Sequence, residues 1–142
     1  EKLQRNDEPS PARSAVLVRR SNSHIRIGTF QRLKYLNEYD SIALLLNYIS
    51  ENYFTNFKSK KSLKILAENI FLESVKRIAE SMGRIVIAGF VHGVLNTDNF
   101  NVTGEVFDYG PWRFIEFADS SFTAAYFDNY GRYSFRKNIK NS

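Results

Sequence analysis

Two blocks decide the fold of this sequence: Gly89-Phe90-Val91-His92-Gly93-Val94-Leu95-Asn96-Thr97-Asp98-Asn99 and Asp108-Tyr109-Gly110-Pro111. Between them, residues 100–102 and 105–107 are separated by Thr103-Gly104, a pair that is typical of a hairpin turn. Such a hairpin brings the Asn99 amide oxygen and the Asp108 carboxylate to the same place. Because Mg²⁺ prefers oxygen ligands of this kind on a nucleotide phosphate, the pattern predicts a metal site at Asn99 and Asp108.

The order of these blocks resembles the catalytic parts of a protein kinase, where an H-R-D-x-x-x-x-N loop precedes a metal-binding D-F-G. His92-Gly93-Val94 stands in the place of H-R-D, and Asn99 follows Val94 at the kinase spacing. Val94 cannot accept a proton, so the pattern is that of a pseudokinase. Asp98 is the carboxylate that remains beside Asn99, and it is the predicted general base. We expect His92 and His24 to be structural.

The residues before the first block predict a change from extended to helical structure. Residues 1–13, with two prolines, are expected to be an extended lead-in. Residues 14–29 are expected to be a strand and turn region, with a strand at Ala15–Val18, alternating polar and apolar residues at 24–27 and a bend at Gly28-Thr29.

Residues 30–83 show the spacing of buried helical faces. One helix has Asp40 or Ser41 as its N-cap, residues 53–61 form a loop, and Ser62 caps a long helix that ends at or near Gly83. The apolar stripe of this long helix consists of Leu63, Leu66, Ala67, Ile70, Phe71, Ser74 and Ile78. Residues 84–111 hold the catalytic loop, the hairpin and Asp-Tyr-Gly, and residues 112–142 an activation-segment-like loop and tail. The expected fold is α+β and mainly α.

Composition excludes several classes of protein. The 142 residues are 43% hydrophobic, which excludes disorder throughout, and they contain no cysteine, which excludes disulfides, thiolate nucleophiles and zinc-thiolate sites. The apolar runs are far shorter than the ~20 residues that span a bilayer, so we expect no membrane partner. The net charge of +5 allows a nucleic-acid interpretation. The basic residues are dispersed, however, and we expect solvated surface and no nucleic-acid partner.

The two blocks resemble the selenoprotein O (YdiU) family of kinase-fold protein adenylyltransferases. Supporting matches lie at 15–19, 23–31 and 131–135, so the resemblance covers almost the whole chain. It implies a protein-kinase-like fold, represented here by a C-lobe core segment, and transfer of AMP from ATP to Ser, Thr or Tyr hydroxyls of proteins.

By the same resemblance, Asp98 is the general base, Asn99 and Asp108 bind Mg²⁺ or Mn²⁺, and Arg19 and Arg26 bind the triphosphate. It also implies a nucleotide that is reversed relative to kinases, which removes the need for an Asp at Val94. The implied location is the cytoplasm in a bacterium and the mitochondrion in a eukaryote.

The sequence also departs from the family. Leu95 and Phe100 replace methionines, and the glycine-rich loop, the paired Lys and Glu and the carboxyl-terminal cysteine or selenocysteine are absent. In the family, an amino-terminal lobe that precedes this segment carries the loop and the pair. We therefore expect a middle fragment that needs this lobe as a partner and shows little or no turnover alone. The alternatives are an ATP-dependent phosphotransferase, a non-catalytic remnant or binding module, and a basic nucleic-acid binder.

Overall fold

A computed structural model describes residues 2–3, 12–13, 15–57 and 62–136 of the chain. Within these ranges the protein is α+β and mainly helical, as predicted. Its elements are β1 (Lys2–Leu3), β2 (Ala12–Arg13), α1 (Ile27–Tyr35), α2 (Tyr39–Asn52), the 3-10 helix η1 (Thr55–Phe57), α3 (Leu63–Ile87), β3 (Phe90–His92) and β4 (Trp112–Phe114). The strands form two antiparallel pairs, β1 with β2 and β3 with β4.

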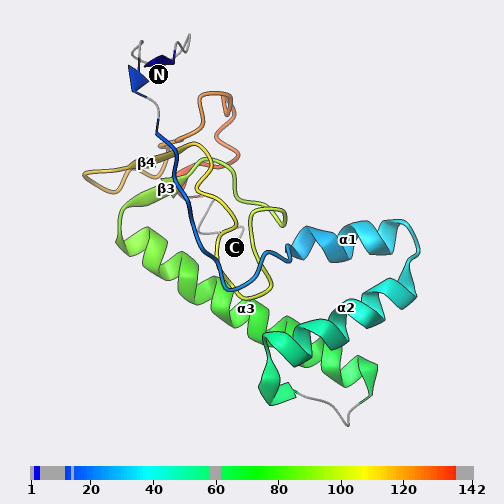
Figure 1. Cartoon of the computed structure of the whole chain (residues 1–142). Helices are drawn as coiled ribbons and strands as arrows, with labels where there is room; N and C mark the ends of the chain where they lie inside the picture. The colour runs from blue at the N-terminus through cyan, green and yellow to red at the C-terminus, as the bar shows by residue number, and fades with distance from the viewer. Residues whose placement is uncertain (1, 4–11, 14, 58–61, 137–142) are drawn as a thin grey trace.

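Helix α3 is the longest element described, and α2, η1 and β3 pack against it. Its 25 residues extend about 37 Å, with α2 packed against its first half and the β3–β4 pair at its carboxyl end (Figure 1). A core of Leu46, Ile49, Phe54, Leu66, Ile70 and Val102 joins α2, α3 and the 100–107 hairpin. The Ser74 hydroxyl donates to the Val102 carbonyl at 2.7 Å, which fixes the hairpin on α3. In the described part of the chain, no helix combines the length and apolarity needed to span a bilayer.

The start of α3 is predicted correctly, whereas its end is not. The Ser62 hydroxyl accepts a hydrogen bond from the Ile65 amide at 3.4 Å, which confirms the predicted N-cap. The helix continues through Gly83 to Ile87 and ends before Gly89, whose φ of +66° suits glycine. Gly83 lies in the helix without contacts that would require or forbid a side chain, so nothing stops the helix there.

The predicted apolar stripe of α3 is only partly buried. Leu66, Ile70 and Ser74 are buried, but Leu63 and Phe71 are 44% and 66% exposed. The face that meets α2 and the hairpin is therefore narrower than the stripe.

The amino-terminal predictions are mostly wrong. Ala15–Val18 is not a strand: residues 15–20 have no regular structure, and Val16 and Val18 are 93% and 90% exposed. The alternation at 24–27 yields only one bridge, between Arg26 and Asn101, and Gly28-Thr29 lies inside α1 rather than at a bend. Among the residues that the structure describes, 15–25 pair with no strand, and the hairpin holds this segment. Of the predicted lead-in, residues 2–3 and 12–13 pair with each other, and the rest lies outside the described residues.

Two further predictions concern element boundaries. Helix α2 begins at Tyr39 after an N-cap at Glu38, which is earlier than Asp40 or Ser41, and Ser41 instead donates to the Glu38 carboxylate at 3.1 Å. Of the predicted loop at 53–61, residues 55–57 form η1 and residues 58–61 lie outside the described part. Strand β4 was not predicted, because its three residues alternate over too short a stretch to indicate a strand.

Candidate nucleotide and metal site

The loop between β3 and the hairpin is held by asparagine side chains. The Asn96 amide oxygen accepts from the Asp98 backbone N–H at 2.8 Å, and the Asn99 amide oxygen accepts from the Asn96 N–H at 3.3 Å. A backbone bond from Asn99 N to Asn96 O at 3.0 Å closes the same turn. These local bonds favour a turn and fix where residues 98 and 99 leave it.

The predicted hairpin brings Asn99 and Asp108 together. Phe100 bridges Val106, and the Phe107 N–H donates to the Asn99 carbonyl at 2.6 Å, so the two sides pair as expected. Gly104 turns the chain with a φ of +90°. The Asn99 amide nitrogen consequently lies 3.3 and 3.4 Å from the two carboxylate oxygens of Asp108.

The donor set suits Mg²⁺ or Mn²⁺ bound through few protein ligands. The described residues contain no cluster of three or more His, Cys, Asp or Glu side chains that would form an all-protein cage. Asn99 and Asp108 offer an amide and a carboxylate, and a rotation of the Asn99 amide by 180°, which releases its bond from the Asn96 N–H, would direct its oxygen toward Asp108. A magnesium ion that keeps its waters and also binds substrate phosphates needs no more than such a pair.

His92 is a buried support for Asp108, as the structural interpretation predicted. Its side chain is fully buried, its Nδ1 accepts from the Val94 N–H at 3.0 Å, and its Nε2 lies 3.0 Å from the Asp108 carbonyl oxygen. Since Nδ1 accepts, Nε2 carries the proton and donates to Asp108. Burial lowers the pKa of His92 below its ordinary value of 6.5, although Asp108 opposes this effect. The ring is therefore neutral at pH 7, and both of its nitrogens form hydrogen bonds.

The Asp98 carboxylate is directed toward α1. A Cβ on Gly28, in the first turn of α1, would overlap Asp98 Oδ1, so only a glycine allows the carboxylate to approach this closely. Asp98 is exposed, and it lines a cavity of about 490 Å³ together with His24, Arg26, Gly28, Thr29, Gln31 and Arg32. The predicted base therefore borders an open cavity that contains several cationic side chains.

The two predicted phosphate ligands, Arg19 and Arg26, contact the aromatic residues that precede and follow Asp108 in the chain. The Arg26 guanidinium lies 3.7 Å from the ring centre of Phe107, and that of Arg19 lies 5.2 Å from the ring centre of Tyr109. Arg19 also donates to the Val106 carbonyl. Phe107 and Tyr109 are the chain neighbours of Asp108, so each cation contacts a ring that is adjacent in sequence to the predicted metal ligand.

Glu105 positions the amino-terminal segment and was not predicted from the sequence. Its carboxylate accepts hydrogen bonds from Ser21 Oγ at 3.0 Å, from Thr103 Oγ1 at 2.8 Å and from the backbone and side chain of Asn22. Burial would raise the pKa of Glu105, but these hydrogen bonds together lower it below its ordinary value. A glutamate that follows a turn carries no local signal for such a role, because Ser21 and Asn22, the partners in the amino-terminal segment, lie more than 80 residues away.

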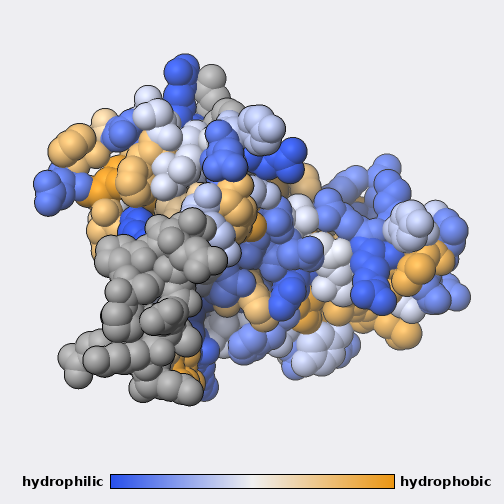
Figure 2. Space-filling model, turned by 90° about the horizontal axis from the view of Figure 1, so that it is seen from above, coloured by the Kyte–Doolittle hydropathy of each residue, from blue (hydrophilic) through white to orange (hydrophobic). Residues whose placement is uncertain are grey.

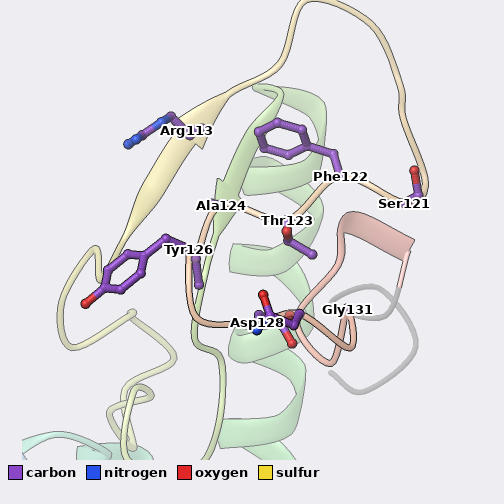
Figure 3. A pocket seen from close by; sticks show the side chains of 10 residues that line it. Arg113, Ser121, Phe122, Thr123, Ala124, Tyr126, Asp128 and Gly131 are labelled. Carbon is purple, nitrogen blue, oxygen red and sulfur yellow. The ribbon is translucent and has the colours of Figure 1, made fainter. Parts of the chain in front are cut away.

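A second pocket lies beside β4, on the segment that follows Asp-Tyr-Gly (Figure 3). Arg113 and Tyr126 point to one side of it, and Ser121 lies at the other. The buried Asp128 carboxylate accepts from the backbone N–H groups of Arg132 and Tyr133, both at 2.7 Å. Both of its oxygens thus stabilise a turn, and we assign this pocket no chemistry.

A family model and individual relatives of known sequence place this chain in the same family. Residues 1–140 match the family described as protein adenylyltransferase SelO. The chain is 50% identical over 133 residues to the protein nucleotidyltransferase YdiU of Trichormus variabilis, covering 94% of this chain and 27% of the relative. The protein of the same name from Pelagibacter ubique is 33% identical over 129 residues, covering 91% of this chain and 26% of the relative. The chain thus spans about a quarter of the length of these relatives. Since the family match extends over nearly every residue, the chain belongs to the SelO (YdiU) family of protein nucleotidyltransferases.

Proposed function

We propose that this chain is the core of a nucleotidyltransferase site that transfers AMP from ATP to the hydroxyl of a protein Ser, Thr or Tyr. The observation that carries the proposal is the set of contacts around Asp108: Asn99 contacts its carboxylate, and Arg19 and Arg26 lie on the rings of its chain neighbours Tyr109 and Phe107. Family membership supports nucleotidyl transfer as the reaction class.

Each residue has a distinct role in this proposal. Asn99 and Asp108 hold Mg²⁺ or Mn²⁺, which neutralises phosphate charge when bound. Arg19 and Arg26 bind the triphosphate with guanidinium groups already oriented by aromatic rings. Asp98 accepts the proton of the acceptor hydroxyl, whose oxygen then forms a bond to the α-phosphorus. The bond from that phosphorus to the bridging oxygen of the β-phosphate breaks, and pyrophosphate leaves.

We infer a kinase-like C-lobe for the fold. The support is the order of parts: a buried histidine on β3, an asparagine loop, a hairpin, an Asp-Tyr-Gly triplet and a returning strand that pairs with β3. In this arrangement the acceptor reaches Asp98 through the cavity that Arg26 and Arg32 line. Parts that resemble a glycine-rich loop and its Lys–Glu pair are not found in the sequence. We therefore expect the 142 residues alone to give little or no turnover.

The test is the fate of labelled phosphates in a complete enzyme. The chain replaces the corresponding segment of the Trichormus variabilis relative, and the chimera is incubated with Mg²⁺, a generic protein acceptor and ATP labelled at either the α- or the γ-phosphate. We expect label on the acceptor from α-labelled ATP only, and loss of that label in Asp108→Ala. Asp40→Asn, an exposed acidic position on α2, is the matched control and keeps the activity.

Two outcomes of this experiment would contradict the proposal. Transfer of γ-label alone would support the phosphotransferase alternative. Failure of the chimera to transfer either label, with the unmodified relative active in the same assay, would support a non-catalytic remnant.

A further inference from the structure

An aromatic cluster adjoins the candidate phosphate site on the β3–β4 sheet. Phe90 lies at its centre, with ring centroids 5.8 Å from Tyr109, 5.6 Å from Trp112 and 5.5 Å from Phe114. Trp112 and Phe114 also contact each other at 5.5 Å. We call these four residues the aromatic cluster. Its rings hold one another in place, so the cluster presents a preformed surface.

The cluster is open to solvent although its members are large and apolar. Tyr109 is 39% exposed, Trp112 43% and Phe114 64%. Phe90 stacks on Trp112 at an interplanar angle of 18°, so one face of the indole is covered while much of the side chain remains exposed. Apolar side chains are visible on the left of Figure 2, on the side where β3 and β4 lie in Figure 1. An exposed group of rings of this kind is typical of a binding surface.

The cluster is continuous with the Asn99–Asp108 site. Trp112 lies opposite His92 in the sheet, and the His92 ring bonds to the carbonyl of Asp108. Tyr109 follows Asp108 directly and carries the Arg19 guanidinium on its ring. From Asp108 to Trp112 the chain spans at most about 14 Å, a length comparable with that of an extended nucleoside triphosphate.

We propose that the aromatic cluster stacks the base of the nucleotide whose phosphates lie at Asn99 and Asp108, an inference that rests on the function proposed above. Asp108 of the metal site, Tyr109 with the Arg19 guanidinium on its ring, and the Trp112 ring follow one another along the chain, in the order of the parts of a nucleoside triphosphate. Stacking on aromatic side chains stabilises a base without requiring contacts to its edges. The exposed indole of Trp112 is the principal stacking surface.

The sequence provides its own reporter, because Trp112 is the one tryptophan among the 142 residues. Indole fluorescence of the chain is followed while either Mg-ATP or magnesium tripolyphosphate is added, and competition between the two ligands tests for a shared site. We expect ATP to quench the fluorescence and tripolyphosphate, which has no base, to bind without quenching. Equal affinities for the two ligands with no quenching would overturn this inference and leave the proposed phosphate site intact. Failure of both ligands to bind to the chain and also to the chimera would contradict the proposed function itself.

Substitutions of Trp112 then distinguish binding of the base from binding of the phosphates. Isothermal titration calorimetry measures both affinities, because substitution of Trp112 removes the only indole. Trp112→Leu is expected to raise the Kd for ATP at least about fivefold while that for tripolyphosphate stays unchanged. Trp112→Phe, which keeps a ring, should recover most of the lost affinity. Phe117→Leu is the matched control, because Phe117 is 75% exposed and has no ring contact with the cluster. An equal loss for both ligands in Trp112→Leu, or no loss for either, would contradict stacking of the base.

Discussion

Gly110 lies against the buried ring of His92, two residues after Asp108. Its φ is +53°, and a Cβ there would lie 2.6 Å from His92 Cε1. A side chain at this position would therefore meet both backbone strain and a ring that cannot move, since His92 is fixed by hydrogen bonds through both nitrogens. The position of Asp108 thus depends on a glycine and a histidine that take no part in the chemistry.

We expect Gly110→Ala to lower the free energy of unfolding by about 1–3 kcal/mol, because strain and steric overlap add. Gly83→Ala is the matched control: Gly83 lies in α3 with open space around it, and alanine there should be neutral or stabilise by about 0.5–1 kcal/mol. Urea unfolding of the three proteins measures the difference. Equal stability of the two variants would show that the His92 contact is not as close as described.

His92 predicts a pH dependence of stability. Burial lowers its folded pKa below the ordinary 6.5, so the folded state favours the neutral ring. Stability is therefore complete above pH 6.5 and falls as the pH drops toward the folded pKa, with a slope of at most about 1.4 kcal/mol per pH unit for one proton.

Urea unfolding between pH 8 and pH 5 measures this slope. We expect it to persist in His24→Gln, which removes the exposed histidine, and to disappear in His92→Gln. The reverse result would assign the titration to His24.

Among the elements, those that depend on interactions between residues close in sequence were predicted from local sequence patterns. Ser62 caps α3 and Thr103-Gly104 turns the hairpin because each depends on neighbours within a few residues. The structure of residues 15–26 could not be predicted in the same way. They contain strand-like residues, yet the hydrogen bonds that fix them come from Glu105 and Asn101, about 80 residues away. A single sequence gives no signal for such pairs.

Glu105 should therefore control the order of the segment that carries Arg19. Glu105→Gln removes the charged acceptor for Ser21 and Asn22, so we expect trypsin to cleave after Arg20 several times faster than in the unchanged chain. Mass spectrometry of the released amino-terminal peptide gives the rate. Glu116→Gln, an exposed glutamate beyond β4, serves as the control and should leave the rate unchanged. Identical rates in all three proteins would show that Glu105 does not hold the segment.

At the scale of the whole molecule, the candidate site was more predictable than the fold around it. The spacing from Asn99 to Asp108 predicted their contact because one hairpin joins them. The role of Arg19 and Arg26 as triphosphate ligands was implied only by the family resemblance, and their contacts with Tyr109 and Phe107 could not be predicted from the sequence. The direction of the Asp98 carboxylate toward α1 was not predicted, since it depends on how α1 packs against the loop through Gly28.

In the proposed site, Asp98 accepts the proton, and Asn99 and Asp108 bind the metal. The most direct test is the rate of α-label transfer by the Asp98→Asn chimera at saturating Mg-ATP, with the Kd for ATP measured on the same preparation. We expect the rate of α-label transfer to fall at least about 100-fold while the Kd for ATP changes little, because a general base acts on the acceptor and not on the nucleotide. A chimera that transfers AMP at the unchanged rate without the Asp98 carboxylate would contradict this assignment.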